Sequence, residues 1–208
     1  MPPACPASAH DVVPGRAQCA RSIRRRAGGL ECRAWETYYR REWGAFLAAS
    51  VGLVRAAFGM SWPRTLSGAW LVLRANQVWA PYPNNDPDAA RRLMTRFYQL
   101  LRKSTGEGFD PGRAAWLEVE WWRVHREAQH AEGSGPSEEL TVALRDLYAY
   151  SYSSDPADVR AAAALRAEAM DVSDRWVEGG CDPDDPRLAH ERALLVRSYA
   201  SLLAAVHR

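Results

Sequence analysis

Five Asp-Pro dipeptides divide the chain into segments, and they constrain its fold more than any other feature of the sequence. They lie at positions 86–87, 110–111, 155–156, 182–183 and 185–186. An aspartate accepts hydrogen bonds from the free amides of a first helical turn, and proline suits the first helical position because the amide that it lacks has no partner there. Each dipeptide therefore predicts the start of an α-helix.

Apolar residues between these dipeptides recur at steps of three and four, which is the spacing of one face of an α-helix. One such series is Ala90, Leu93, Met94, Phe97 and Leu101. No segment has a credible strand pattern. The spacing predicts seven helices, over residues 34–58, 63–79, 87–104, 111–131, 137–152, 156–178 and 186–206.

The length of the chain favours a single domain. Its 208 residues, 47% of them hydrophobic, suffice for one core of ordinary size. The predicted connections are short and no period repeats, so we expect an all-α fold in which residues 34–208 form a single-domain antiparallel helical bundle of about seven helices. Residues 1–33 hold four prolines and six arginines without periodicity, which predicts a disordered basic tail.

The formal charge of +2 is unevenly distributed. Residues 1–33 carry six arginines against two acidic residues, whereas residues 34–208 carry 21 basic and 23 acidic side chains. Binding to many phosphates needs a surplus of Lys and Arg, so the helical domain is not expected to bind nucleic acid. A nucleic acid or anionic surface bound by the tail is the last-ranked hypothesis, through Arg21, Arg24, Arg25 and Arg26.

The cysteines and the apolar stretches are typical of a cytoplasmic protein. The four cysteines form no C-x-x-C pair, so we expect reduced thiols rather than a structural zinc site or a disulfide framework. The longest apolar stretch, residues 44–60, is interrupted by Arg55 and is shorter than the roughly 20 residues of a spanning helix. We therefore expect a buried helix there and no membrane span.

The predicted helix over 111–131 carries the most titratable side chains. With about 100° per residue, Glu118 and His125 fall on one flank of its apolar face, beside Trp122 and Gln129. Partial burial beside a tryptophan would raise the pKa of a carboxyl group, so Glu118 and His125 are a candidate catalytic acid-base pair. A structural hydrogen bond is the favoured alternative.

The same helix contains one Glu-x-x-His spacing, at Glu127 and His130. Di-iron helical bundles present a carboxylate and an imidazole to a metal in this way, but they need a second such pair and two further carboxylates. The chain has no second Glu-x-x-His. We therefore predict no metal site, and the sequence assigns no cofactor.

An arginine stands on the apolar face of the helix predicted over 156–178. Arg166 lies in line with Met170 and Ser173, and a guanidinium in such a position needs a carboxylate. A structural ion pair is the favoured interpretation, and a ligand carboxylate is the alternative. Asp171 and Asp174, at i and i+3, are candidate partners of nearby arginines or of a cation.

The segment from Arg74 to Asp86 is rich in planar polar groups and aromatic rings. Asn76, Gln77 and Trp79 end one predicted helix, and a proline-containing connection leads to the next. Rigid loops of this kind make good binding edges, although Asn, Asp and Pro also serve as ordinary helix caps and connectors. The connector is the favoured interpretation.

Two functional hypotheses rank above binding of an anionic partner by the tail. The first is a helical domain that binds a small apolar or aromatic ligand, or a protein partner, in a cavity without convergent carboxylates. Its candidate binding residues are Arg74, Asn76, Gln77, Trp79, Trp122 and Arg166. The alternative is a helical-bundle enzyme, metal-dependent or metal-free, that uses Glu118 and His125 with Asp171, Asp174 or Glu36 as further ligands. The sequence leaves open whether the protein is catalytic.

Overall fold

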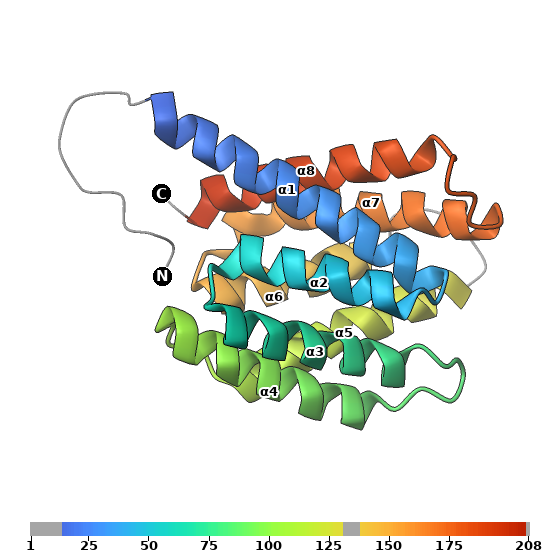
Figure 1. Ribbon diagram of the computed structural model, residues 1–208, viewed down its shortest axis with the longest axis horizontal. Coiled ribbons are helices and arrows are strands. Elements are labelled where there is room, and N and C mark those ends of the chain that lie inside the picture. The colour runs from blue at the N-terminus through green and yellow to red at the C-terminus, as the bar shows by residue number, and fades with distance from the viewer. Residues whose placement is uncertain (1–13, 131–137, 207–208) are drawn as a thin grey trace.

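Helices account for all the regular secondary structure in the described residues. The computed structural model describes residues 14–130 and 138–206, with side chains from residue 25 onward (Figure 1). The helices are α1 (Pro14–Tyr39), α2 (Trp43–Phe58), α3 (Trp62–Trp79), α4 (Pro87–Thr105), α5 (Pro111–His130), α6 (Glu138–Tyr152), α7 (Pro156–Glu178) and α8 (Arg187–Val206). The predicted all-α fold is confirmed. Within these residues, no helix is both long and apolar enough to cross a membrane.

Residues 14–130 and 138–206 contain eight helices where the sequence predicted about seven, because the predicted helix over 34–58 is split. The chain turns between α1 and α2, where Arg41 has a φ of 61°. No glycine or proline marks this turn, so the apolar spacing runs through it without a signal.

The packed domain also begins earlier than the predicted boundary at residue 34. Residues 25–33, assigned to the tail from sequence, lie in α1, and Ala27, Glu31 and Cys32 are buried there. Residues 1–13 of the predicted tail lie outside the described part of the chain.

Several aspartates of the Asp-Pro dipeptides do cap helices. Asp86 accepts a hydrogen bond from the amide of Ala89 at the start of α4, and Asp155 accepts one from Ala157 at the start of α7, both at 2.8 Å. Asp110 and Asp185 bond likewise to amides at the starts of α5 and α8. Asp182, in contrast, bonds to an amide within the loop before α8.

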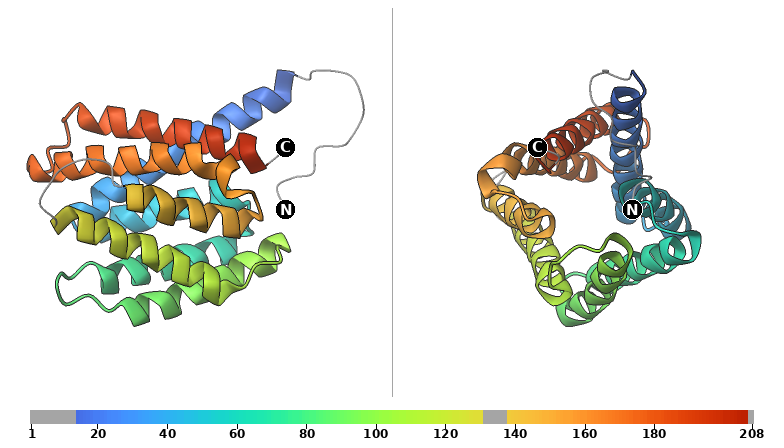
Figure 2. Two further views of the ribbon diagram at one scale, coloured as in Figure 1. Left: turned by 180° about the vertical axis from the view of Figure 1, so that it is seen from behind. Right: turned by 90° about the vertical axis from the view of Figure 1, so that its left-hand side faces the viewer.

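The eight helices form a closed ring. Each helix packs against the next in sequence, and α8 packs against α1 (Figure 2). The main core fills the interior with side chains from α2 to α8, and α1 contributes Trp35 to its edge. Because the chain runs back and forth, α1, α3, α5 and α7 all end at one end of the ring (Figure 1).

A buried arginine connects several helices inside the ring. The Arg166 guanidinium on α7 pairs with the Glu31 carboxylate on α1 at 2.5 Å, and it donates to the Tyr148 hydroxyl on α6 at 3.0 Å. It also lies 5.1 Å from the Trp121 ring and 5.9 Å from the Trp35 ring. The carboxylate partner expected for Arg166 is therefore Glu31, from a segment predicted to be a tail.

Removing this carboxylate should strongly destabilise the fold. We expect Glu31→Ala to lower the free energy of unfolding by about 3–5 kcal/mol, because it leaves the Arg166 guanidinium buried without a counter-charge. Urea denaturation followed by circular dichroism measures the change. The control is Glu138→Ala, which breaks an exposed pair with Arg160 and should cost less than about 1 kcal/mol. Equal losses in the two variants would contradict the role of Glu31.

Candidate functional site

A pocket of about 80 Å³ lies towards the end of the ring where the odd-numbered helices end. Its walls are mainly aromatic and come from α1, α2, α3 and α5, whereas α7 closes one side with Met170 and Ser173. The aromatic residues are Trp35, Tyr38, Tyr39, Phe46, Trp79, Trp121 and Trp122, and the other polar ones are Asn76, His125, Arg126 and Gln129.

Two adjacent tryptophans of α5 form part of this wall. The rings of Trp121 and Trp122 meet nearly at right angles, with centroids 6.0 Å apart. Trp122 packs against Trp79 of α3 at 5.8 Å, and all three side chains are buried. The wall is therefore closely packed and presents aromatic surface to the pocket.

A hydrogen-bond network borders the pocket between α5, α7 and α1. His125 Nε2 lies 2.9 Å from an Asp174 carboxylate oxygen, and Gln129 Nε2 donates to the other oxygen at 2.6 Å. Gln129 also donates to the Tyr39 hydroxyl at 2.8 Å. An ionised carboxylate only accepts, so Nε2 of His125 carries a proton and Nδ1 is the basic nitrogen of the neutral ring.

Tyr39 stays protonated in this network. Burial raises the pKa of its hydroxyl well above the usual range, and the nearby negative charge of Asp174 raises it further. The hydroxyl is therefore a neutral hydrogen-bonding group at physiological pH. Tyr39 and Gln129 together hold the Asp174 carboxylate beside the imidazole.

Arg126 is the cation of the pocket that has no ion-pair partner within the described residues. Its guanidinium donates to the Tyr38 hydroxyl at 3.0 Å and lies 5.8 Å from the Trp79 ring and 5.7 Å from the Tyr82 ring. The Asp174 carboxylate beside the neutral His125 ring is the opposing charge at this side of the pocket, but no ion pair joins it to Arg126 among the described residues.

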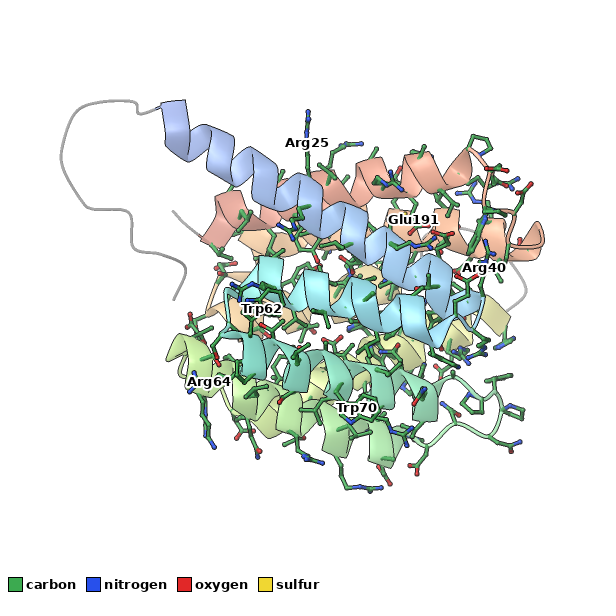
Figure 3. The ribbon with its side chains drawn as sticks, in the orientation of Figure 1. Arg25, Arg40, Trp62, Arg64, Trp70 and Glu191 are labelled. Carbon is green, nitrogen blue, oxygen red and sulfur yellow. The ribbon has the colours of Figure 1, made fainter. Side chains whose placement is uncertain are left out.

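A buried carboxyl group lies behind the α7 side of the pocket. Glu191 of α8 is fully buried, and neither of its oxygens has a hydrogen-bond partner among the described residues. Its neighbours include the Cys32 thiol and the Ser173 hydroxyl, and Figure 3 shows it where α8 passes behind α1. Burial raises the pKa of Glu191 to about 8 and that of Cys32 to about 12, so both are mainly neutral at pH 7.

The candidate binding residues from the sequence separate into three groups. Asn76, Trp79 and Trp122 line the pocket. Arg74 and Gln77 instead bond to each other at 2.6 Å in an exposed position. Arg166 lies in the ring interior, where it contacts the Trp35 and Trp121 rings that also line the pocket.

The structure does not bring Glu118 and His125 together. They are seven positions apart in sequence, which is about 10 Å along a helix axis. Glu118 accepts a hydrogen bond from the Tyr98 hydroxyl at 2.8 Å, and burial raises its pKa against the opposing charge of Arg166. The acidic partner of His125 is Asp174. Of the four residues predicted to share one flank of this helix, Trp122, His125 and Gln129 line the pocket, whereas Glu118 does not.

The other candidate metal ligands have separate partners. Glu127 pairs with Arg123, and the His130 ring stacks on Tyr82 with centroids 3.9 Å apart. Asp171 pairs with Arg175. Across residues 14–130 and 138–206, no three His, Cys, Asp or Glu side chains are grouped so that they could hold a metal ion.

Some pocket residues were not identified from the sequence. Tyr38 and Arg126 carried no signal beyond their residue type. Gln129 was recognised as a neighbour on the flank of His125, but its bond to Asp174 depends on α5 and α7 lying close together. Local spacing contains no information on that contact.

Comparison of the chain with protein-family models, curated proteins and solved structures finds no match. Function must therefore be inferred from the geometry and chemistry of the pocket.

Replacing the buried Glu191 should change how stability depends on pH. The raised pKa means that the folded protein keeps the Glu191 proton up to about pH 8, whereas the unfolded chain releases it above about pH 4.5. The free energy of unfolding therefore falls as pH rises from about 4.5 to 8. Glu191→Gln removes this effect. Between pH 5 and pH 8 the free energy of unfolding of the variant should gain about 2 kcal/mol or more relative to the wild type.

Urea unfolding at both pH values measures this gain. Glu139→Gln, which alters an exposed carboxyl group on α6, is the control and should follow the wild type. A constant difference between Glu191→Gln and the wild type at all pH values would show that Glu191 is already ionised at pH 5.

Proposed function

We propose that the protein binds a small aromatic acid in this pocket. The observation that carries the proposal is an aromatic lining in which the Arg126 guanidinium has no ion-pair partner among the described residues. No carboxylate belongs to the described lining, which favours the ligand-binding hypothesis over a site with convergent acids. In this proposal the ligand ring packs against the tryptophan wall and its anionic group pairs with Arg126.

The size of the pocket excludes ligands that would bury more than one ring. A core cavity of about 150 Å³ accommodates benzene, and this pocket has about half that volume. Tyr38 and Arg126 are partly exposed at its border. A single ring would therefore enter only in part, and its substituent would stay near the guanidinium.

The polar border supports selection among such ligands. His125 Nδ1 can accept a hydrogen bond, whereas the Ser173 hydroxyl is buried in the wall without a partner among the described residues. A buried polar group left unpaired costs free energy. A hydroxyl or amino substituent of the ligand that hydrogen-bonds to His125 or Ser173 would therefore strengthen binding.

A pair of matched probes tests the charge requirement. We expect benzoate to bind at least about tenfold more tightly than benzamide, because both have one ring and only benzoate carries a charge for Arg126. Arg126→Gln should remove most of this difference. Isothermal titration calorimetry at low ionic strength measures both affinities.

Arg123→Gln is the matched control, since Arg123 lies one turn away on α5 and pairs with Glu120 and Glu127 outside the pocket. It should keep the preference for benzoate. A second variant, Trp122→Ala, should weaken both probes, with folding checked by circular dichroism. Equal affinity for benzoate and benzamide in the wild type, or no binding of either, would contradict the proposal.

The hydrogen bond between His125 and Asp174 favours a second candidate, an enzyme that uses His125 as a general base. The carboxylate would fix the imidazole orientation and stabilise its protonated form, and Nδ1 would accept a proton from a water molecule that attacks an ester. The proton would then pass to the leaving phenolate. This candidate replaces Glu118 with Asp174 as the partner of His125.

Hydrolysis of a phenyl ester tests this enzyme. If His125 is the base, saturable hydrolysis should fall about 100-fold or more in His125→Ala, and Asp174→Asn should also lower kcat because the amide can stabilise the wrong tautomer. His130→Ala, which removes the imidazole stacked on Tyr82, is the control. Hydrolysis that is unaffected by His125→Ala would leave ligand binding as the proposed function.

A further inference from the structure

Helix α3 exposes a row of large apolar side chains on the outside of the ring. Trp62, Leu66 and Trp70 are 58%, 54% and 55% exposed. They follow one another at steps of four residues, so the row extends about 12 Å along the helix. Figure 3 shows Trp62 and Trp70 on α3. We call these three side chains the outer α3 face.

This face is unusual because α3 is apolar on its packed side as well. Thr65, Gly68, Ala69 and Leu71 are among its buried residues. An exposed row of large apolar side chains on a helix that already has a packed side commonly marks a contact surface. The outer α3 face therefore has the composition of a contact surface, although only the opposite side of the helix packs within the ring.

The neighbouring helix α2 extends this surface. The Arg55 guanidinium lies 4.4 Å from the Trp62 ring. Residues Gly44, Ala48 and Val51 fall on the same side of α2 as Arg55 by helical spacing, and they are exposed or partly exposed. The surface beside the outer α3 face is thus made of small apolar groups and a guanidinium.

The charge around this surface is strongly positive. Residues 43–85 contain no Asp or Glu but three arginines, Arg55, Arg64 and Arg74. Over residues 43–105, which span α2 to α4, eight basic residues stand against two acidic ones, whereas the rest of the chain has 19 basic and 23 acidic residues. The near-neutral total hides a basic sector, and a partner that complements it must be anionic.

We propose that the outer α3 face docks on an anionic lipid surface. Tryptophan is favoured at membrane interfaces because its ring is apolar and its indole NH is polar, and Leu66 adds an apolar group between the two rings. Arg64 and Arg74, both exposed on α3, pair with lipid phosphates. The row projects from the outer side of the ring, so it enters the headgroup region of a deformable surface without a matching groove.

A second copy of the chain fits this surface less well. A two-fold contact between outer α3 faces would bring Arg55, Arg64 and Arg74 close to the same three arginines of the other copy. No acidic residue between 43 and 85 is present to compensate them. An anionic surface has the complementary charge.

Co-sedimentation with lipid vesicles tests the proposal. We expect the full chain to bind vesicles of phosphatidylcholine mixed with phosphatidylserine at least about tenfold more tightly than vesicles of phosphatidylcholine alone. A variant with Trp62→Ala, Leu66→Ala and Trp70→Ala should bind the anionic vesicles about tenfold more weakly or worse. A separate variant with Arg64→Gln and Arg74→Gln should show a similar loss.

The matched control is Trp116→Ala. Trp116 on α5 is 39% exposed and has Arg113 at 4.4 Å from its ring, so it resembles Trp62 with Arg55 but lies outside the basic sector. This variant should bind as the wild type does, and circular dichroism should show the same helicity in every variant. The arginine variant keeps the test valid if the triple variant fails to fold.

Four results would overturn the proposal. The first is equal binding of the wild type to neutral and anionic vesicles, and the second is a loss of binding in Trp116→Ala as large as that in the triple variant. The third is a wild type that self-associates but does not bind vesicles, with self-association lost in the triple variant. The fourth is a wild type that binds a single-stranded oligonucleotide but not anionic vesicles.

Discussion

The ion pair between Glu31 and Arg166 joins the first helix to the seventh across the interior of the ring. A buried guanidinium is tolerated only with a counter-charge and further polar or aromatic partners, and Arg166 has both, in Glu31 and in the rings of Tyr148, Trp121 and Trp35. The position of α1 therefore depends on a group on α7. Because Trp35 and Trp121 also line the pocket, the same interaction supports the pocket wall.

The pocket combines a closely packed apolar wall with a small number of polar groups whose orientation is set from other helices. Asp174 on α7 orients His125 on α5, and Gln129 and Tyr39 hold Asp174. This arrangement serves either ligand recognition or general-base chemistry, since both need an imidazole in one orientation. Because the Arg126 guanidinium has no ion-pair partner among the described residues, recognition of a small aromatic acid is the better supported of the two.

The charge distribution shows how a total can mislead. The helical domain has slightly more acidic than basic residues, which argued against binding of nucleic acid by the domain. The ring places the basic residues of α2 to α4 in one sector, and the acidic surplus lies elsewhere in the chain. Charge acts over about 10 Å at physiological salt, so a partner interacts with the sector and not with the total.

The sequence alone determined most of the helices from α2 onward and much of their inward faces, because helix starts and faces depend on residues within one or two turns. Asp86, Asp110 and Asp155 mark helix starts, and Trp122, His125 and Gln129 share a flank that the structure turns into the pocket. The tertiary structure alone decided which residues are partners. His125 bonds to Asp174, 49 residues away, and Arg166 pairs with a residue of the predicted tail. Those choices depend on which helices are neighbours when the ring closes, and that closure is a property of the whole packed core.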